Sequence, residues 1–382
     1  MKEKPELQPY QTNFDSYDLI IIGTPVWVAN YAPPLNTFFS RVKIINKKIA
    51  LFALIFYIPF QLVFEGNGLW FDLALAPFAL VIFYFLRKCK FFAAGVVSGV
   101  AIFTKQTAFW FFIPVAVYLY LRQKKAFLGK LVITAEGLLI AILPPLLILS
   151  FLGILGDFYR WAIDFGIFYL PKASGQIHLP TIKQFLVSLF PFIIFIPFLA
   201  ERKQKDFDLA VWTFFAVLGT LPRFELFHFQ PALPFLAIAA GLVFEKIIKS
   251  KKALLKALFA GYVISILILF VSFLFRNWKK EARFFGRDEI NISAFVKSSL
   301  NPGDTLYVFN YWDSIYAMSS NLPSVKPLVP FLPWYFEYKE MKKEVLNDLI
   351  LDMPDIIVKG NYSRSGLGSY KFTDGDVLLD RY

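Results

Sequence analysis

The chain has 382 residues, of which 57% are hydrophobic and 19% aromatic, and its mean hydropathy is +0.55. The charged residues, 18% of the total, gather in short clusters between long apolar runs, a pattern that argues against one large soluble core. The net charge of +12 is typical of cytoplasmic loops in a membrane protein, so we expect a lipid bilayer as partner and no nucleic acid.

The first patterned stretch, Ser16–Ala53, contains "YDLIIIGTPVW", "APPLNTFFSR" and "NKKIALFA". These motifs resemble the middle of a flavodoxin-family domain over residues 2–52. The resemblance implies a strand that ends in a flavin-facing loop, then a helix, then a strand at "KKIALF", and it implies FMN contacts from Thr24, Pro25 and Trp27. Because so few elements cannot bury both faces of a sheet, we favour a leftover fragment, with a membrane-tethered FMN flavoprotein as an alternative.

Apolar runs of about the length that spans a membrane follow one another from residue 49 onward. The candidate spans are 49–64, 69–86, 131–155, 185–200, 209–221, 229–244 and 254–275. Two shorter runs, 91–103 and 108–121, are separated by "TKQT" and predict a hairpin with Lys105 at its tip. The sequence therefore predicts a mainly α, polytopic protein with about eight or nine spans.

Basic clusters fall at alternate ends of these runs. They precede the first span and lie in "RKCK", "RQKK", "ERKQK" and "EKIIKSKK". The positive-inside rule places all of them in the cytoplasm together with the N-terminus. It places "EGNG", "TKQT", residues 156–183 and "PRFELFHFQP" on the outer face, with everything after residue 276. We expect a multi-pass protein of the cell or inner membrane.

Beyond residue 275 the composition becomes that of a small α/β unit. "NISAFVKSSL" and "FEYKEMKKEVLNDLI" predict helices, and "LYVFN" and "DIIVK" predict strands. This alternation favours a partial parallel sheet.

Three stretches carry a second resemblance: "GVVSGVAIFTKQTAFWFFIPVAVYLYLRQKK", "PRFELFHFQPALPFLAIAAG" and "NPGDTLYVFNYWDSIYAMSS". Over residues 53–382 the chain resembles membrane glycosyltransferases of the GT-C fold, in the mannosyltransferase and aminoarabinose-transferase superfamily. The resemblance implies transfer of a sugar from a polyprenyl-phosphate carrier to a glycan, lipid or protein acceptor at the outer face of the cell envelope.

The superfamily's acidic loop and first helices have no counterpart before "GNGLWFDLALAP". The chain therefore resembles a fusion of two genes near Phe52, with a flavodoxin-like fragment (1–52), a transmembrane domain (53–275) and an outer α/β domain (276–382). We expect such a chain to have little or no transferase activity alone.

The charged residues at the predicted outer face are candidates for a site. Lys105 is suited to a lipid phosphate because a lysine between apolar half-helices is costly without an anion or water, and Gln106 adds a hydrogen-bonding group. Arg223 and Glu225 complete the candidate substrate-binding set. The candidate catalytic residues are Asp72 and Glu65, as acids near the first outer loop, and His228, as a proton carrier.

Each candidate also has a structural interpretation. Asp72 can accept from Lys105, Arg223 can pair with Glu225, and His228 can cap the next span. Asp157, Arg160, Trp161 and Asp164 predict an amphipathic helix for anchoring or acceptor contact, and Tyr311, Trp312 and Trp334 are candidates for sugar stacking or interfacial anchoring.

We expect no resident cofactor. With only His178 and His228 there is no histidine metal motif, and a divalent ion held by carboxylates and phosphates stays an alternative. The rival hypothesis for function is a non-catalytic membrane protein that binds a lipid carrier.

Overall fold

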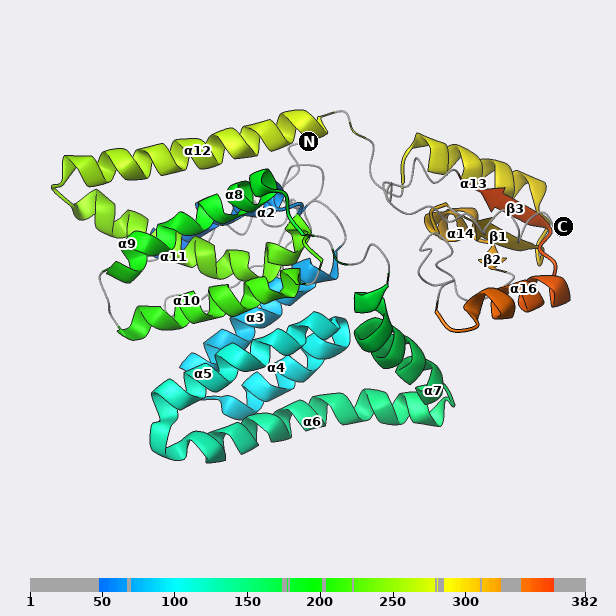
Figure 1. Cartoon of the computed structure of the whole chain (residues 1–382), viewed down its shortest axis with the longest axis horizontal. Helices are drawn as coiled ribbons and strands as arrows, with labels where there is room; N and C mark the ends of the chain where they lie inside the picture. Colours follow the sequence, from blue (N-terminus) through cyan, green and yellow to red (C-terminus); the bar gives the residue numbers. More distant parts are fainter. Residues whose placement is uncertain are drawn as a thin grey trace, which may run out of the picture.

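The computed structural model describes residues 48–66, 70–173, 177, 179–200, 204–221, 223–278, 280, 285–309, 311–323 and 338–360. These residues form a mostly helical structure with one small sheet near the C-terminal end (Figure 1). Most of the flavodoxin-like fragment, with Thr24, Pro25 and Trp27, lies outside the described residues.

The helical part consists of α2 (Lys48–Val63), α3 (Phe71–Arg87), α4 (Phe91–Thr104), η2 (Gln106–Phe111), α5 (Phe112–Gln123), η3 (Lys124–Ala126), α6 (Phe127–Phe151), α7 (Leu155–Phe158), η4 (Tyr159–Tyr169), η5 (Leu170–Lys172), α8 (Ile182–Leu189), η6 (Phe190–Ile194), α9 (Phe195–Ala200), α10 (Gln204–Val217), η7 (Leu218–Thr220), η8 (Leu226–Ala232), α11 (Leu233–Lys249) and α12 (Ala253–Asn277). η4 is a π-helix, whereas the other η segments are 3-10 helices. Each predicted apolar run is largely helical.

Three helical stretches of the described chain are long and apolar enough to cross a membrane: Gln106–Phe151, Leu226–Lys249 and Ala253–Asn277. Shorter apolar helices occur at Phe52–Val63, Phe91–Thr104, Ile182–Pro197 and Phe207–Thr220. The first long stretch reverses direction near Lys124–Ala126, so that α5 and α6 lie side by side (Figure 1). The structure is compatible with a membrane protein, and the larger number of spans stays a prediction.

Helix α2 corrects one expectation from the sequence. The strand predicted at "KKIALF" is wrong, because Lys48–Val63 forms one helix that runs through the proposed junction at Phe52 and Ala53. The helix packs along α11, and the ring of Phe52 lies 4.5 Å from that of Phe244, centroid to centroid. The helix agrees with the apolar run predicted at 49–64, which is longer than a strand needs and continues through Pro59, and it buries Phe56 and Phe60 on its neighbours.

Helices α4 and α6 approach each other through small residues. A Cβ placed on Gly95 would lie 1.9 Å from the carbonyl oxygen of Thr134, and one on Gly137 would lie 2.1 Å from that of Phe92. Such close backbone contact is typical of helix pairs in membranes, where small residues allow van der Waals packing without a hydrophobic driving force. Glycine is therefore required at these positions of the pair.

The long helices expose many large apolar side chains. The residues that α6 buries are Thr134 and Gly137, and α12 buries Phe259, Tyr262 and Ile266. Phe151 at the end of α6 is 91% exposed. Water would make this arrangement unfavourable, whereas hydrocarbon chains cover such surfaces at no cost.

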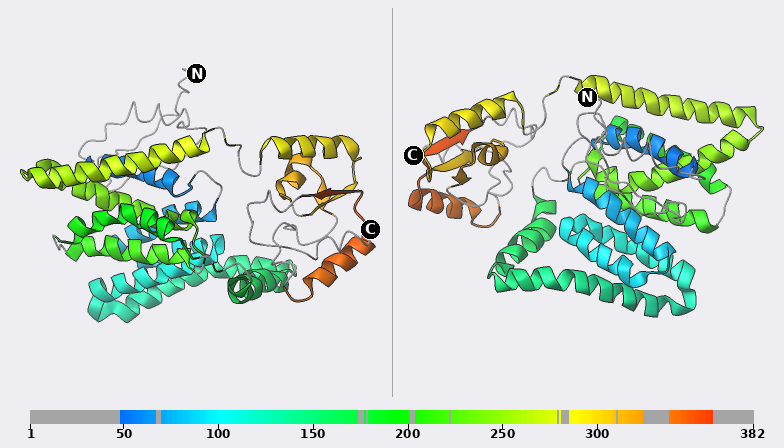
Figure 2. Two further views of the ribbon diagram at one scale, coloured as in Figure 1. Left: turned by 45° about the horizontal axis from the view of Figure 1, so that its top comes forward. Right: turned by 180° about the vertical axis from the view of Figure 1, so that it is seen from behind.

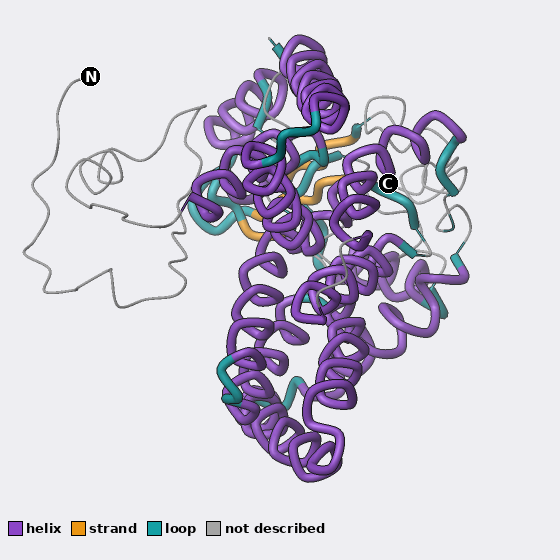
Figure 3. The backbone as a smooth tube through the Cα atoms, turned by 90° about the vertical axis from the view of Figure 1, so that its left-hand side faces the viewer, coloured by secondary structure: helices purple, strands orange, loops and turns teal. Residues whose placement is uncertain are grey.

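The C-terminal unit (285–309, 311–323 and 338–360) contains α13 (Arg287–Ser299), β1 (Thr305–Phe309), α14 (Ser314–Ser319), β2 (Leu322–Pro323), α16 (Met341–Leu351) and β3 (Ile356–Lys359). Its three strands are parallel in the order β2-β1-β3, with Leu306 opposite Ile356 and Thr305 opposite Leu322. Strands confined to one small group are also evident in Figure 3. The predicted partial parallel sheet is confirmed.

Strand β1 is buried on both faces. Leu306 and Val308 pack with Val296 of α13 and Ile315 of α14, while the alternate residues Tyr307 and Phe309 pack with α16. This alternation follows from the two-residue period of a strand. Helices therefore cover both faces of the sheet, as a parallel sheet requires.

The C-terminal unit lies beyond one end of the helical part, which we call the unit-facing end. Helices α6 and α12 both finish on this side (Figures 1 and 2). Of the segments that the sequence predicts to be outside, residues 65–66 follow α2, residue 70 precedes α3, and residues 104–107 join α4 to η2 on this side.

Candidate functional site

Three ionisable side chains from distant segments meet at the unit-facing end. Lys105 Nζ lies 2.5 Å from Asp72 Oδ2, and His228 Nδ1 lies 3.0 Å from Asp72 Oδ1. Lys105 Nζ is also 3.2 Å from His228 Nδ1. We call these three residues the charge cluster. The sequence-based alternative in which Asp72 accepts from Lys105 is therefore present in the structure.

Each member comes from the end of a helix or from a short 3-10 segment. Asp72 is in the first turn of α3, where a carboxylate interacts favourably with the helix dipole. Lys105 is extended (φ −160°, ψ 131°) between the end of α4 and the start of η2. His228 lies in η8, which leads into α11. The ends of apolar helices and a short 3-10 segment thus carry the three members of the charge cluster.

The contacts restrict the protonation states of the cluster. An ammonium only donates, so Nδ1 of His228 accepts from Lys105 only if it lacks a hydrogen, and then no hydrogen lies between it and Asp72. With a hydrogen on Nδ1, the ring donates to one oxygen of Asp72 while Lys105 donates to the other. We favour this second state because both carboxylate oxygens then have a donor. Nε2 of a neutral ring is left as an acceptor.

The cluster is shielded but not sealed. The side chain of Asp72 is 3% exposed, that of His228 13% and that of Lys105 19%. The carboxylate is therefore the innermost member, and the two nitrogen-bearing groups lie between it and the surface. A carboxylate at this depth must be paired, whereas the ammonium remains reachable by an anion from outside.

Aromatic rings flank the charge cluster. Trp70, the residue before α3, stacks on Phe227 with centroids 4.2 Å apart and planes 10° from parallel. Phe227 also meets the ring of His228 edge-on at 4.3 Å. These rings restrict the positions of the histidine and of the start of α3, and they lower the local polarity around the cluster.

The other predicted site residues do not join the cluster. Arg223 Nε donates to Glu225 Oε1 at 3.2 Å, as in the structural interpretation. Glu65 lies in the turn after α2 with φ 57°, where a non-glycine residue is uncommon. Gln106 Nε2 donates to the carbonyl oxygen of Ala162 in η4 at 3.3 Å rather than to a member of the charge cluster.

Gln230 is a residue that the sequence analysis missed. It is fully buried, and its Nε2 donates to the carbonyl oxygens of Gln61 at 3.0 Å and Phe64 at 2.8 Å. Both carbonyls lie at the end of α2, and that of Gln61 also accepts from the backbone N–H of Gly66 at 2.7 Å. The signal in the sequence was a single amide side chain within the apolar stretch "FHFQPALPF". The hydrogen bonds of Gln230 connect η8 to the end of α2.

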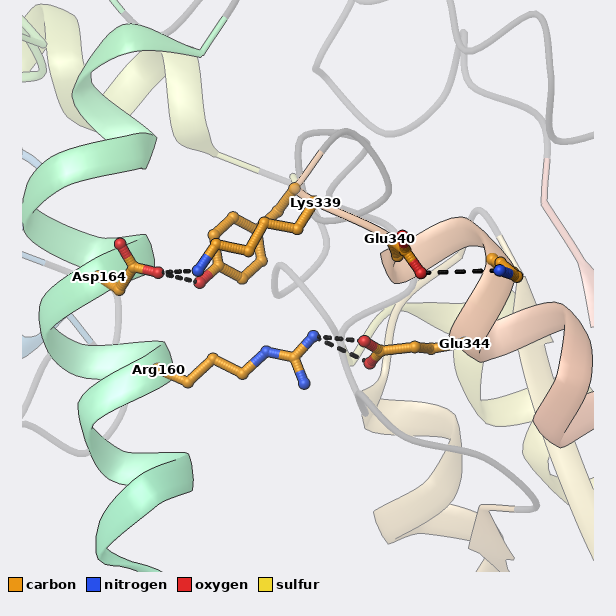
Figure 4. A network of polar contacts seen from close by, with 7 residues as sticks. Arg160, Asp164, Lys339, Glu340 and Glu344 are labelled. Carbon is orange, nitrogen blue, oxygen red and sulfur yellow. Dashed lines mark hydrogen bonds and ion pairs between the residues drawn. The ribbon is translucent and has the colours of Figure 1, made fainter.

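The predicted amphipathic helix at 157–164 is found as α7 and η4, but it binds the C-terminal unit (Figure 4). Arg160 donates to both oxygens of Glu344 at 2.7 and 2.9 Å. Asp164 accepts from Lys339 and, at 2.6 Å, from the hydroxyl of Tyr338. Neither interpretation from the sequence, anchoring or acceptor contact, included this intramolecular role.

The remaining candidates have separate positions. Tyr311 donates to Glu289 at 2.9 Å within the C-terminal unit, where Trp312 also lies. Trp334 and His178 fall outside the described residues. Among the described residues no group of three or more His, Cys, Asp or Glu side chains is placed to hold a metal ion.

Comparison of the chain with protein-family models, with curated proteins and with solved structures gives no match.

Proposed function

We propose that the protein handles a polyprenyl-phosphate-linked sugar at the unit-facing end of its helices, as a membrane glycosyltransferase or a protein derived from one. The observation that carries this proposal is the convergence of Lys105, Asp72 and His228 at one end of apolar helices. Such a group is costly in an apolar setting unless it has a function or a full set of partners. The resemblance of residues 53–382 to GT-C enzymes supports the same class.

The charge cluster offers donors to a lipid-linked phosphodiester, which carries one negative charge. With Asp72 ionised, Lys105 protonated and His228 neutral, the cluster has no net charge, so the phosphate is held by the hydrogen-bond donors of the ammonium and His228 stays able to take a proton. Lys105 is the member best placed to contact the phosphate, because its ammonium has three donors and only one is used by Asp72 Oδ2.

The reaction assigns one role to each residue. The hydroxyl oxygen of the acceptor attacks the anomeric carbon of the sugar, and the bond from that carbon to the phosphate oxygen breaks with its electron pair. Lys105 stabilises the charge that develops on the leaving polyprenyl phosphate. Nε2 of His228 takes the hydroxyl proton, and Asp72 orients the ring through Nδ1 and stabilises the imidazolium.

The test is binding of undecaprenyl phosphate to the full chain in detergent micelles. Lys105→Met combined with Asp72→Leu removes the ammonium without leaving a carboxylate unpaired, and we expect it to abolish binding. Lys172→Met is the matched control, because Lys172 is an exposed lysine of η5 at the same end. Undiminished binding by the double variant would refute the proposal.

A second candidate function, lipid-carrier binding without transfer, is favoured by the ion pair between Lys105 and Asp72. Because both oxygens of Asp72 already have a nitrogen partner, catalysis would depend on His228 alone as the proton acceptor. His228→Gln distinguishes the two functions. We expect it to retain lipid binding under both, and to reduce sugar transfer from an undecaprenyl-phosphate donor only if the chain is an enzyme.

A further inference from the structure

The short loop that carries Lys105 is held on one side to the end of α7 and on the other to η4, which continues directly from α7. Before the lysine, the ring of Phe103 stacks on that of Phe158, with centroids 5.9 Å apart and an interplanar angle of 20°. After it, Gln106 Nε2 donates to the carbonyl oxygen of Ala162. Lys105 itself is extended between two helix ends, so these two contacts define where its side chain starts.

η4 in turn takes its packing from the C-terminal unit. Phe165 is its one buried residue, and the ring lies 5.2 Å from that of Tyr338, which is fully buried. Arg160 and Asp164 add the ion pairs to Glu344 and Lys339 (Figure 4). Trp161 packs against both Tyr338 and the cluster that contains Phe309 and Met341.

The conformation of η4 makes it a suitable connecting element. Its 11 residues form a π-helix, a conformation that is rare and usually limited to single turns at functional sites. The described contacts that stabilise it come mainly from the C-terminal unit on one side and from the Lys105 loop on the other.

We infer that docking of the C-terminal unit onto η4 positions Lys105 against Asp72, so that the unit regulates the charge cluster from a distance. Arg160 and Glu344 are positioning residues in this scheme, since they contact neither the cluster nor a ligand. The effect of docking on the binding of a lipid phosphate rests on the proposed function, whereas the positioning of Lys105 is independent of it.

The experiment exchanges the charges across the interface in the full chain. Arg160→Glu and Glu344→Arg each place like charges face to face, and the double variant R160E/E344R restores an opposite pair. The readout is the rate of Lys105 acylation by a water-soluble N-hydroxysuccinimide ester, measured by peptide mass spectrometry. We expect each single variant to change this rate about tenfold, a usual size for coupling between sites, and the double variant to return it toward that of the wild type.

Glu340→Arg is the matched control. Glu340 lies one turn before Glu344 and pairs with Lys343 rather than with η4 (Figure 4), so the same charge change there should leave the rate unaltered. An unchanged Lys105 rate in both single variants, with the proteins folded by tryptophan fluorescence, overturns the inference. So does a double variant that behaves like the singles.

Undecaprenyl phosphate binding is measured on the same proteins and separates the two proposals. If the acylation rate responds to the charge exchange but the lipid does not bind even to the wild type, the positioning of Lys105 stands and the proposed function fails. If the lipid binds and the single variants weaken binding with rescue in the double, both proposals are supported.

Discussion

At the scale of single residues, the behaviour of the charge cluster depends on how its charges are balanced. Asp72 is nearly sealed from solvent and has two nitrogen-bearing partners, so its charge is compensated only while Lys105 stays in place. Removing one partner of a buried pair leaves an uncompensated charge, whereas removing both together leaves none. Stability and function therefore respond differently to single and double substitutions.

We predict that Asp72→Asn destabilises the protein by about 2 kcal/mol, somewhat less than for a fully sealed pair, because Lys105 is partly exposed. The double variant D72L/K105M should recover most of this loss, since neither side chain is then charged. Thermal unfolding in detergent at constant protein concentration measures both. A double variant as unstable as the single one would show that the attraction between Asp72 and Lys105 stabilises the folded protein by more than the desolvation of the two charges costs.

A second prediction concerns the pH dependence of docking. The hydrogen bonds from Lys339 and then Tyr338 hold the pKa of Asp164 below its usual 3.8. A carboxylate whose pKa is lower in the folded protein than in the unfolded chain stabilises the folded state at pH values above its unfolded pKa. This contribution disappears as the pH falls through its folded pKa. The contact of η4 with the C-terminal unit should therefore loosen below about pH 3.8. The measurement is the fluorescence of Trp161 in a variant without other tryptophans near the interface.

The control for this pH effect is Asp164→Asn, in which that component of the acid transition should be absent. Transitions that coincide in the wild type and in Asp164→Asn would mean that other carboxylates, and not Asp164, determine the acid sensitivity of docking.

At the scale of elements, α6 is held mainly by α4, and the small residues decide how close the two helices come. Gly95 and Gly99 are one helical turn apart on α4, and both face α6, where Thr134 and Ala141 lie against them. Backbone contact of this kind gives more dispersion energy than side chains at a distance would.

We predict that Gly95→Val destabilises the protein by about 3 kcal/mol, because the added carbons overlap the backbone of Thr134 and force the helices apart. Gly261→Ala in α12 is the matched control, since no atom lies within 4 Å of the added carbon there. Chemical unfolding in micelles compares the two. Equal stability of both variants would contradict the close approach of α4 and α6.

At the scale of the whole molecule, the orientation in the membrane is the property that most constrains function. The charge cluster, η4 and the C-terminal unit share one end of the helices (Figure 1). The basic turn that contains Cys89 joins the opposite ends of α3 and α4. The positive-inside rule assigns that turn to the cytoplasm.

Cys89 tests this orientation directly, because it is the only cysteine and its side chain is exposed. We predict that a membrane-impermeant maleimide labels it only after the cells are permeabilised. In the variant C89S/D352C, the new thiol replaces an exposed residue at the end of α16 and should be labelled in intact cells. Labelling of Cys89 from outside would invert the topology and place the charge cluster in the cytoplasm.

The sequence by itself determined the position of most described helices, their apolar character and the parallel strands of the C-terminal unit, because run length and apolar periodicity are local properties. The strand implied at "KKIALF" failed, because the apolar run from 49 to 64 that includes most of these residues forms one helix. Tertiary structure alone decided that Asp72 meets His228, 156 residues away, and that Arg160 meets Glu344, 184 residues away. Such pairings arise when whole helices pack, and no local pattern encodes which helix ends will meet.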